Sequence, residues 1–187
     1  MSLRNTLLIC SVLTVFSCTK FDKDFWKDDP KQKENAERFE SVASITIPGG
    51  IGAAEISTHD PQTKRLFVVN NTVGNNRIDV LDFHDPEIAS IIHSIPVAPF
   101  GGLVNSLDVN NGRLAAAVES SVKTDAGKVI IFSTADYSVI KQVAVGALPD
   151  MVTYTPDGKY IISANEGEPN STYSIDPKGT ISIICSK

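Results

Sequence analysis

The chain has 187 residues, of which 42% are hydrophobic and 21% are charged, and its formal net charge at pH 7 is −5. This length and composition fit one globular domain or a piece of a larger protein. Binding to nucleic acid phosphates needs a clustered positive surface, and the sequence has no long basic run, so nucleic acid is excluded as an expected partner.

The N-terminal segment has the pattern of an export signal. Arg4 supplies a positive charge, and the apolar run over residues 7–16 is too short to cross a bilayer as a stable helix. The run ends at Ser17-Cys18, which resembles the lipobox of bacterial lipoproteins, where a small residue precedes the cysteine that becomes lipidated. We therefore predict a lipoprotein signal peptide over residues 1–17 and lipidation of Cys18. An ordinary signal peptide and a short membrane anchor are the alternatives.

The following residues, 18–41, are rich in Lys, Asp and Glu and are predicted to form a polar tether. The cysteines fit this division, because Cys10 lies in the apolar run, Cys18 carries the predicted lipid and Cys185 stands alone. No pair is left for a disulfide framework or a cysteine metal site. The folded domain is predicted over residues 42–187.

The predicted domain repeats one pattern three times. Two apolar, β-rich runs flank a turn in "STHDPQTKRLFVVNN", "SLDVNNGRLAAAVES" and "VTYTPDGKYIISANEG", and a third run follows in "RIDVLDF", "GKVIIF" and "GTISIIC". Asn and Gly accept a positive φ and Pro favours a turn, so the centres of the first segments predict hairpins. Aligning the second runs places Leu66, Leu114 and Tyr160 at one position. Phe67, Phe132, Tyr154 and Tyr160 are expected to pack between the units.

Units of about 40 to 50 residues with up to four strands match the blades of a β-propeller. No amphipathic helix separates the runs, and a β-sandwich, the alternative, needs no internal repeat. We therefore predict an all-β fold, a partial propeller of the WD40-like or YVTN-like kind. It has about three four-stranded blades, and the last lacks its fourth strand. Propellers typically have about 4 to 8 blades, so the rest of the ring is expected to be missing from this chain.

The repeat also resembles a known family. The segments "GAAEISTHDPQTKRLFVVNN", "VNSLDVNNGRLAAAVES" and "LPDMVTYTPDGKYIISANEGEP" are similar to the choice-of-anchor I family, which is itself similar to mesenchyme-specific cell-surface glycoproteins and is loosely labelled alkaline-phosphatase-like. The resemblance implies an exported, surface-anchored propeller of which this chain is an N-terminal fragment. It implies a place in the bacterial cell envelope, at the outer membrane or cell surface, with the membrane reached through the lipid anchor.

A propeller brings the starts of the innermost strands and the ends of the second strands to one face. Aligning the units predicts a ligand-binding face made of Glu55, Asn71, Asn105, Glu119, Asp150, Asn165, Glu166 and Glu168. Carboxylates on loops suit Ca²⁺, which takes 6–8 oxygen ligands, and the predicted metal ligands are Glu119, Asp150, Glu166 and Glu168. A surface carbohydrate or a protein is the alternative ligand, and an ordinary solvated acidic surface is the alternative to any site.

The predicted function is that of a surface binding or scaffold module, with Ca²⁺ as its cofactor. The alternative is a metal-dependent, phosphoesterase-like hydrolase whose site is completed by downstream blades. No nucleophile motif or histidine cluster supports catalysis, and no catalytic residue is predicted. Arg65, Arg77 and Arg113 begin strands and are expected to lie apart from the acidic end.

Overall fold

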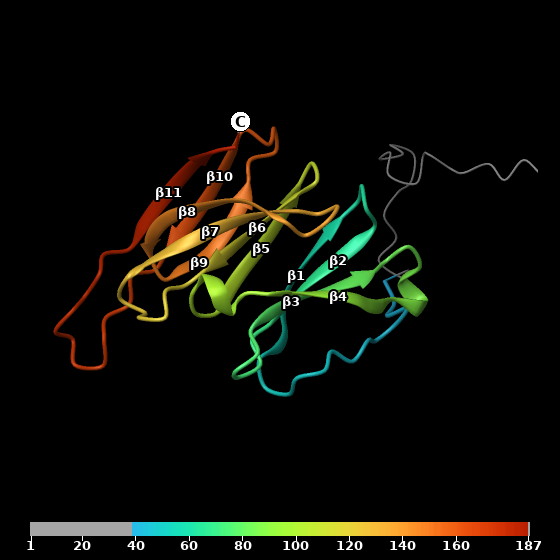
Figure 1. Cartoon of the computed structure of the whole chain (residues 1–187), viewed down its shortest axis with the longest axis horizontal. Coiled ribbons are helices and arrows are strands. Elements are labelled where there is room, and N and C mark those ends of the chain that lie inside the picture. The colour runs from blue at the N-terminus through green and yellow to red at the C-terminus, as the bar shows by residue number, and fades with distance from the viewer. Residues whose placement is uncertain (1–38, 187) are drawn as a thin grey trace, which may run out of the picture. The chain divides into compact units, whose positions relative to one another are not determined.

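The computed structural model describes residues 39–186, within which a compact unit begins at Ser41. The predicted signal peptide, Cys18 and most of the predicted tether lie outside the described residues. The compact unit is all-β, with strands in three antiparallel sheets and two 3-10 turns, η2 (Pro86–Ile88) and η3 (Ala98–Phe100) (Figure 1). None of the described helices is long and apolar enough to span a bilayer.

In each sheet every strand lies beside the strand that precedes it in the chain. The first sheet contains β1 (Ala53–Asp60), β2 (Arg65–Asn70), β3 (Arg77–Asp82) and β4 (Ser90–Pro96). The second contains β5 (Val104–Asn110), β6 (Arg113–Val118), β7 (Ala126–Ser133) and β8 (Val139–Ala147). The third contains β9 (Pro149–Tyr154), β10 (Tyr160–Asn165) and β11 (Thr180–Cys185), with no fourth strand in the described part of the chain.

The first hairpin of each sheet forms at the turn that the sequence predicts. In the second sheet, Asn110 pairs with Arg113 across Asn111 and Gly112, whose φ angles are 47° and 75°. Both residue types accept this left-handed backbone, which matches the twist of the adjoining strands. In the third sheet the positive φ of 64° falls on Gly158 of the Pro-Asp-Gly turn.

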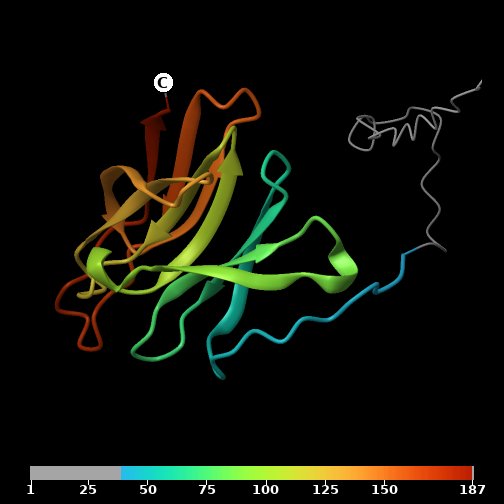
Figure 2. The same cartoon turned by 45° about the vertical axis from the view of Figure 1, so that its right-hand side comes forward.

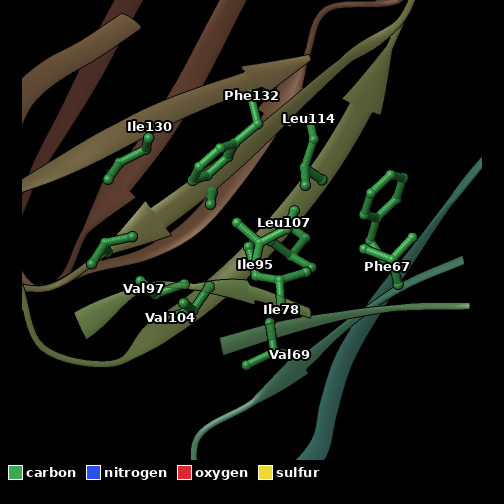
Figure 3. Close-up of a cluster of buried hydrophobic side chains, with 13 residues drawn as sticks. Phe67, Val69, Ile78, Ile95, Val97, Val104, Leu107, Leu114, Ile130 and Phe132 are labelled. Atoms are coloured by element: carbon green, nitrogen blue, oxygen red, sulfur yellow. The ribbon is translucent and has the colours of Figure 1, made fainter. Parts of the chain in front are cut away.

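The sheets pack face to face over apolar side chains. One buried cluster joins the first and second sheets and includes Phe67, Ile78, Leu114 and Phe132 (Figure 3). A second cluster joins the second and third sheets, where the small side chains of β6 meet larger ones of β9 and β10. Burying each large apolar side chain contributes roughly 1.5–3 kcal/mol, so these two layers supply a large favourable term in the folding of the unit.

In the third sheet the second strand, β10, is shifted by one residue from the position that the sequence alignment gives it. Ile161 is 1% exposed and packs in the core, whereas Tyr160 is 45% exposed at the start of the strand. Side chains alternate between the two faces of a strand, so a slip of one residue exchanges the buried and exposed sets. The predicted equivalence of Leu66, Leu114 and Tyr160 is therefore wrong, as is the predicted packing of Tyr160. The expected burial of Phe67, Phe132 and Tyr154 is confirmed.

A buried polar network holds the first sheet together. Asp79 is 1% exposed and accepts hydrogen bonds from Asn70 (2.8 Å), Ser94 (2.6 Å) and Arg77 (2.8 Å). Burial alone would raise the pKa of Asp79, but the hydrogen bonds from Ser94, Asn70 and Arg77 outweigh it and hold the pKa below its ordinary value.

Arg77 corrects one prediction from the sequence. It pairs with Asn70, the last residue of β2, so it lies at the same end of the sheet as the acidic loops. The expectation that all three arginines stand apart from that end is wrong for Arg77, because the third strand of an antiparallel meander starts where the second one ends.

Candidate functional site

The predicted ligand-binding residues gather at one end of the three sheets. At this end the first and second strands of each sheet pair through Ala53 with Asn70, Val104 with Val118, and Pro149 with Asn165. The loops that follow β2, β6 and β10 leave from the same end. In both Figure 1 and Figure 2 these loops lie on the lower side, and the longest is the orange-red loop between β10 and β11.

Backbone hydrogen bonds show which residues are equivalent at this end. The amide groups of Asn71, Glu119 and Glu166 each donate to the carbonyl oxygen just before the first strand of their own sheet, at 2.7, 3.0 and 2.9 Å. Glu166 is therefore the counterpart of Asn71 and Glu119, and Asn165 is not. The sequence alignment missed this because of the one-residue slip in β10.

The buried Asn165 side chain makes its hydrogen bonds within its own sheet. It is 3% exposed, accepts from the hydroxyl of Ser163 (3.1 Å) and donates to the hydroxyls of Thr180 and Ser182, both at 3.0 Å. These bonds use its polar atoms, and its counterpart Asn70 is bonded in the same way inside the first sheet. Asn165 therefore holds β10 to β11.

The predicted residues on the first strands occupy β-bulges. The pairing of β1 with β2 shifts between Ala53 and Ser57, which places Glu55 in a bulge. Similar shifts lie around Asn105 in β5 and Asp150 in β9. Bulges redirect side chains, and they are frequent beside functional sites. No sequence signal marked these bulges.

Asn71 and Asn105 join neighbouring sheets. The Asn71 side chain accepts from the amide of Val104 (3.1 Å) and donates to its carbonyl oxygen (2.8 Å), and it also donates to Glu55 (2.6 Å). Asn105 donates to the carbonyl oxygen of Pro149 (3.1 Å). β5 and β9 lie at the edges of their sheets, and these side chains bond to backbone groups that no neighbouring strand pairs with.

The remaining predicted residues are carboxylates, and three of them lie close to Lys123. The Lys123 ammonium donates to Glu168, and both side chains are about half exposed. The hydrogen bond with Glu168 raises the pKa of Lys123, burial opposes the rise, and the charges of Glu168, Glu119 and Glu166 add to it. The loop after β6 and the loop after β10 thus meet through opposite charges.

Lys123 was missed by the sequence reasoning. The available signal was its place as the one cation of the loop "SSVKTDA", while the equivalent loop of the third unit contains three carboxylates. The long loop also needs Gly167, whose φ is 69°, because a Cβ there would lie 2.6 Å from the carbonyl oxygens of Pro177 and Lys178. Glycine therefore lets the two arms of this loop approach each other.

Comparison with known proteins agrees with this architecture. The family model of the choice-of-anchor I domain matches residues 55–187. The chain belongs to the choice-of-anchor I family. The family membership identifies the chain as a β-rich module of a cell-surface or envelope-associated protein.

Two solved structures have a similar fold. The hydrazine synthase of Kuenenia stuttgartiensis matches with a TM-score of 0.55 and 22% identity, over 70% of this chain and 38% of that one. A luciferin-regenerating enzyme matches with a TM-score of 0.53 and 15% identity, over 70% of this chain and 44% of that one. The choice-of-anchor I chain thus spans less than half the length of either. No curated protein sequence matches it.

Two of the predicted carboxylates of the choice-of-anchor I chain form no hydrogen bond or ion pair in the described region. Asp150 and Glu166 are exposed, and neither side chain has a hydrogen bond or ion pair with residues 39–186. Within the same residues, no three His, Cys, Asp or Glu side chains form a group that could hold a metal ion. Ca²⁺ binding by Glu119, Asp150, Glu166 and Glu168 stays a prediction.

Proposed function

We propose that this choice-of-anchor I protein is an exported, lipid-anchored β-propeller module of the bacterial cell envelope that binds a ligand at the loop end of its sheets. The successive antiparallel sheets support the propeller, since each four-stranded meander is one blade of such a ring. Family membership supports the surface location. The anchor is lipidated Cys18, and the missing blades are supplied by the rest of the protein.

The observation that carries the binding role is the group of three carboxylates near Lys123. Glu119 comes from the second sheet, whereas Glu166 and Glu168 come from the third, and all three charges act on the same ammonium. One lysine leaves a net negative charge among them. Loops held by rigid strands are the usual carriers of binding residues. The surface suits hydroxyl-rich or cationic groups, as on a surface carbohydrate or a protein.

Ca²⁺ is the proposed cofactor at this end of the sheets, and the position of Lys123 provides a way to test it. An ammonium that pairs with Glu168 competes with any metal for the same oxygen atoms. Removing the lysine charge should therefore strengthen Ca²⁺ binding, whereas removing the carboxylates should abolish it. A ligand that binds only the folded state raises stability by about 2.7 kcal/mol at a concentration 100 times its Kd.

Thermal unfolding of the full chain with and without Ca²⁺ tests this function. We expect Ca²⁺ to raise the Tm, the double change Glu166→Gln and Glu168→Gln to remove the rise, and Lys123→Gln to enlarge it. Glu87→Gln, an exposed carboxylate beyond β3, is the matched control and should leave the rise unchanged. An equal Ca²⁺ response in all variants would contradict a site at these loops.

Two further assays address the anchor and the hydrolase alternative. Cys18→Ala should abolish metabolic lipid labelling and detergent partitioning, because a diacylated cysteine supplies the two chains that stable membrane attachment requires. Unchanged partitioning would exclude Cys18 as the anchor. Turnover of generic phosphoesters that depends on an added divalent metal and on Glu166 would favour the hydrolase instead of the binding module.

A further inference from the structure

A cleft of about 500 Å³ opens between the second and third sheets. Its apolar walls are Ile131, Ile140 and Val143 on one side and Ile161 and Ile184 on the other. Ile161 pairs with both Tyr154 and Ile184 near the β9–β10 hairpin, so the cleft lies toward the end of the sheets opposite the acidic loops. It is therefore separate from the ligand-binding face proposed above.

Two cations line this apolar cleft, and none of its lining residues within 39–186 is a carboxylate. The guanidinium of Arg113 donates to the carbonyl oxygen and the hydroxyl of Ser186, which carry no charge. Lys141 has no hydrogen bond or ion pair with any residue in the described region. The cleft is therefore positively charged, although the formal net charge of the chain is −5, and this local positive charge favours binding of an anion.

A buried hydroxyl group at the cleft also lacks a partner. Tyr154 lines the cleft and is 7% exposed, and its hydroxyl oxygen has no hydrogen-bond partner among residues 39–186. Burial raises the pKa of Tyr154 to about 12, so the phenol is a neutral donor at physiological pH. Buried polar groups in native proteins nearly always have a partner, so a ligand acceptor atom is a natural one here.

We propose that the cleft between the second and third sheets binds an amphipathic carboxylate, a small molecule with one carboxylate and an apolar body. The carboxylate is held by Arg113 and Lys141, with Tyr154 donating a hydrogen bond, and the apolar body packs on the isoleucine side chains. Arginine binds carboxylates through a planar fork of donors, and charge-assisted bonds of this kind are strong. The cleft volume lies within the range of about 300–1,000 Å³ that is typical of small-molecule sites.

Calorimetric titration of the full chain with decanoate tests this proposal, with decanol as the ligand that lacks the charge. We expect decanoate to bind at least about tenfold more tightly than decanol, because charge-assisted hydrogen bonds are worth more than neutral ones. Lys141→Gln should weaken decanoate binding about tenfold and leave decanol binding unchanged. Lys159→Gln, an exposed lysine paired with Asp157 outside the cleft, should change neither.

A further variant separates binding from folding. Arg113→Gln is unsuitable for this, because Arg113 also holds Ser186 and its loss changes the cleft itself. Tyr154→Phe keeps the apolar ring and removes only the hydroxyl, so it should weaken decanoate about fivefold while leaving the unfolding midpoint of the ligand-free protein unchanged or higher. Equal binding of decanoate and decanol, or decanoate binding that is unaffected by both Lys141→Gln and Tyr154→Phe, would overturn the proposal.

Discussion

Replacing Asn71 by alanine removes the side chain that links the first two sheets. The Asn71 amide is hydrogen-bonded to both backbone groups of Val104 and to Glu55, and it is 7% exposed. Val104 is 0% exposed, so its amide and carbonyl groups lose their partner in a place that is poorly reached by water. Each buried group left unsatisfied costs about 1–3 kcal/mol.

The expected loss for Asn71→Ala is about 2–4 kcal/mol, because water entering the space of the lost side chain offsets part of the cost. Urea unfolding of the full chain, followed by circular dichroism, measures it. With a slope of about 2 kcal/mol per molar urea, the midpoint should fall by about 1–2 M. Asn75→Ala, an exposed residue of the same loop, should shift the stability by less than about 0.5 kcal/mol.

The variant Asn71→Asp isolates the hydrogen-bond donor. At pH 7 the aspartate still accepts from the Val104 amide, but it cannot donate to the Val104 carbonyl and it faces Glu55. It should therefore be at least as unstable as Asn71→Ala at pH 7 and recover in part when acid protonates the carboxylate. If Asn71→Ala unfolds at the same urea concentration as Asn75→Ala, the inter-sheet role of Asn71 is refuted.

Three other perturbations probe the core, the buried network and the long loop. Leu114→Ala should cost about 2–5 kcal/mol in urea unfolding because Leu114 is 0% exposed, whereas Ile183→Ala, at a position 70% exposed, should cost less than about 0.5 kcal/mol. The Asp79 pKa is depressed below its ordinary value of 3.8, so ionised Asp79 stabilises the fold fully above that pH and loses its effect as the pH falls through the folded-state pKa. Urea midpoints of wild type and Asp79→Asn should accordingly differ by a constant amount above about pH 5 and converge in stronger acid. Gly167→Ala places a Cβ 2.6 Å from the Lys178 carbonyl oxygen, so hydrogen exchange should rise in the 166–179 loop while amides of β6 stay protected.

Local sequence chemistry predicted the strands and their turns well. Asn111 and Gly112, and Gly158 of the Pro-Asp-Gly turn, adopt a positive φ that these residue types accept readily, so their place in the sequence favours a hairpin. The repeat then predicted successive antiparallel units, and the order of strands in each sheet agrees with it. The end of the sheet on which Glu119 and Glu166 lie follows from the same connectivity, since a meander returns to one end after every second strand.

The tertiary structure decided what each of those side chains does. Glu166, rather than Asn165, occupies the position in the third sheet that Glu119 occupies in the second. The sequence alignment missed this because a shift of one residue in strand register cannot be read from the hydrophobic pattern. Asn71 and Asn105 bind the backbone of the next sheet, and that partner exists only once the sheets pack.

The sequence by itself determined the class of fold and the end of the sheets at which the polar residues gather. Only the packing of the sheets decided which polar side chains are hydrogen-bonded within the fold and which are exposed. It also brought Lys123 to Glu168, 45 residues away in the chain. The cleft holding Arg113, Lys141 and Tyr154 was equally hidden, since its walls come from two sheets. Hairpins depend on interactions between near neighbours, whereas a site depends on distances between strands that packing alone sets.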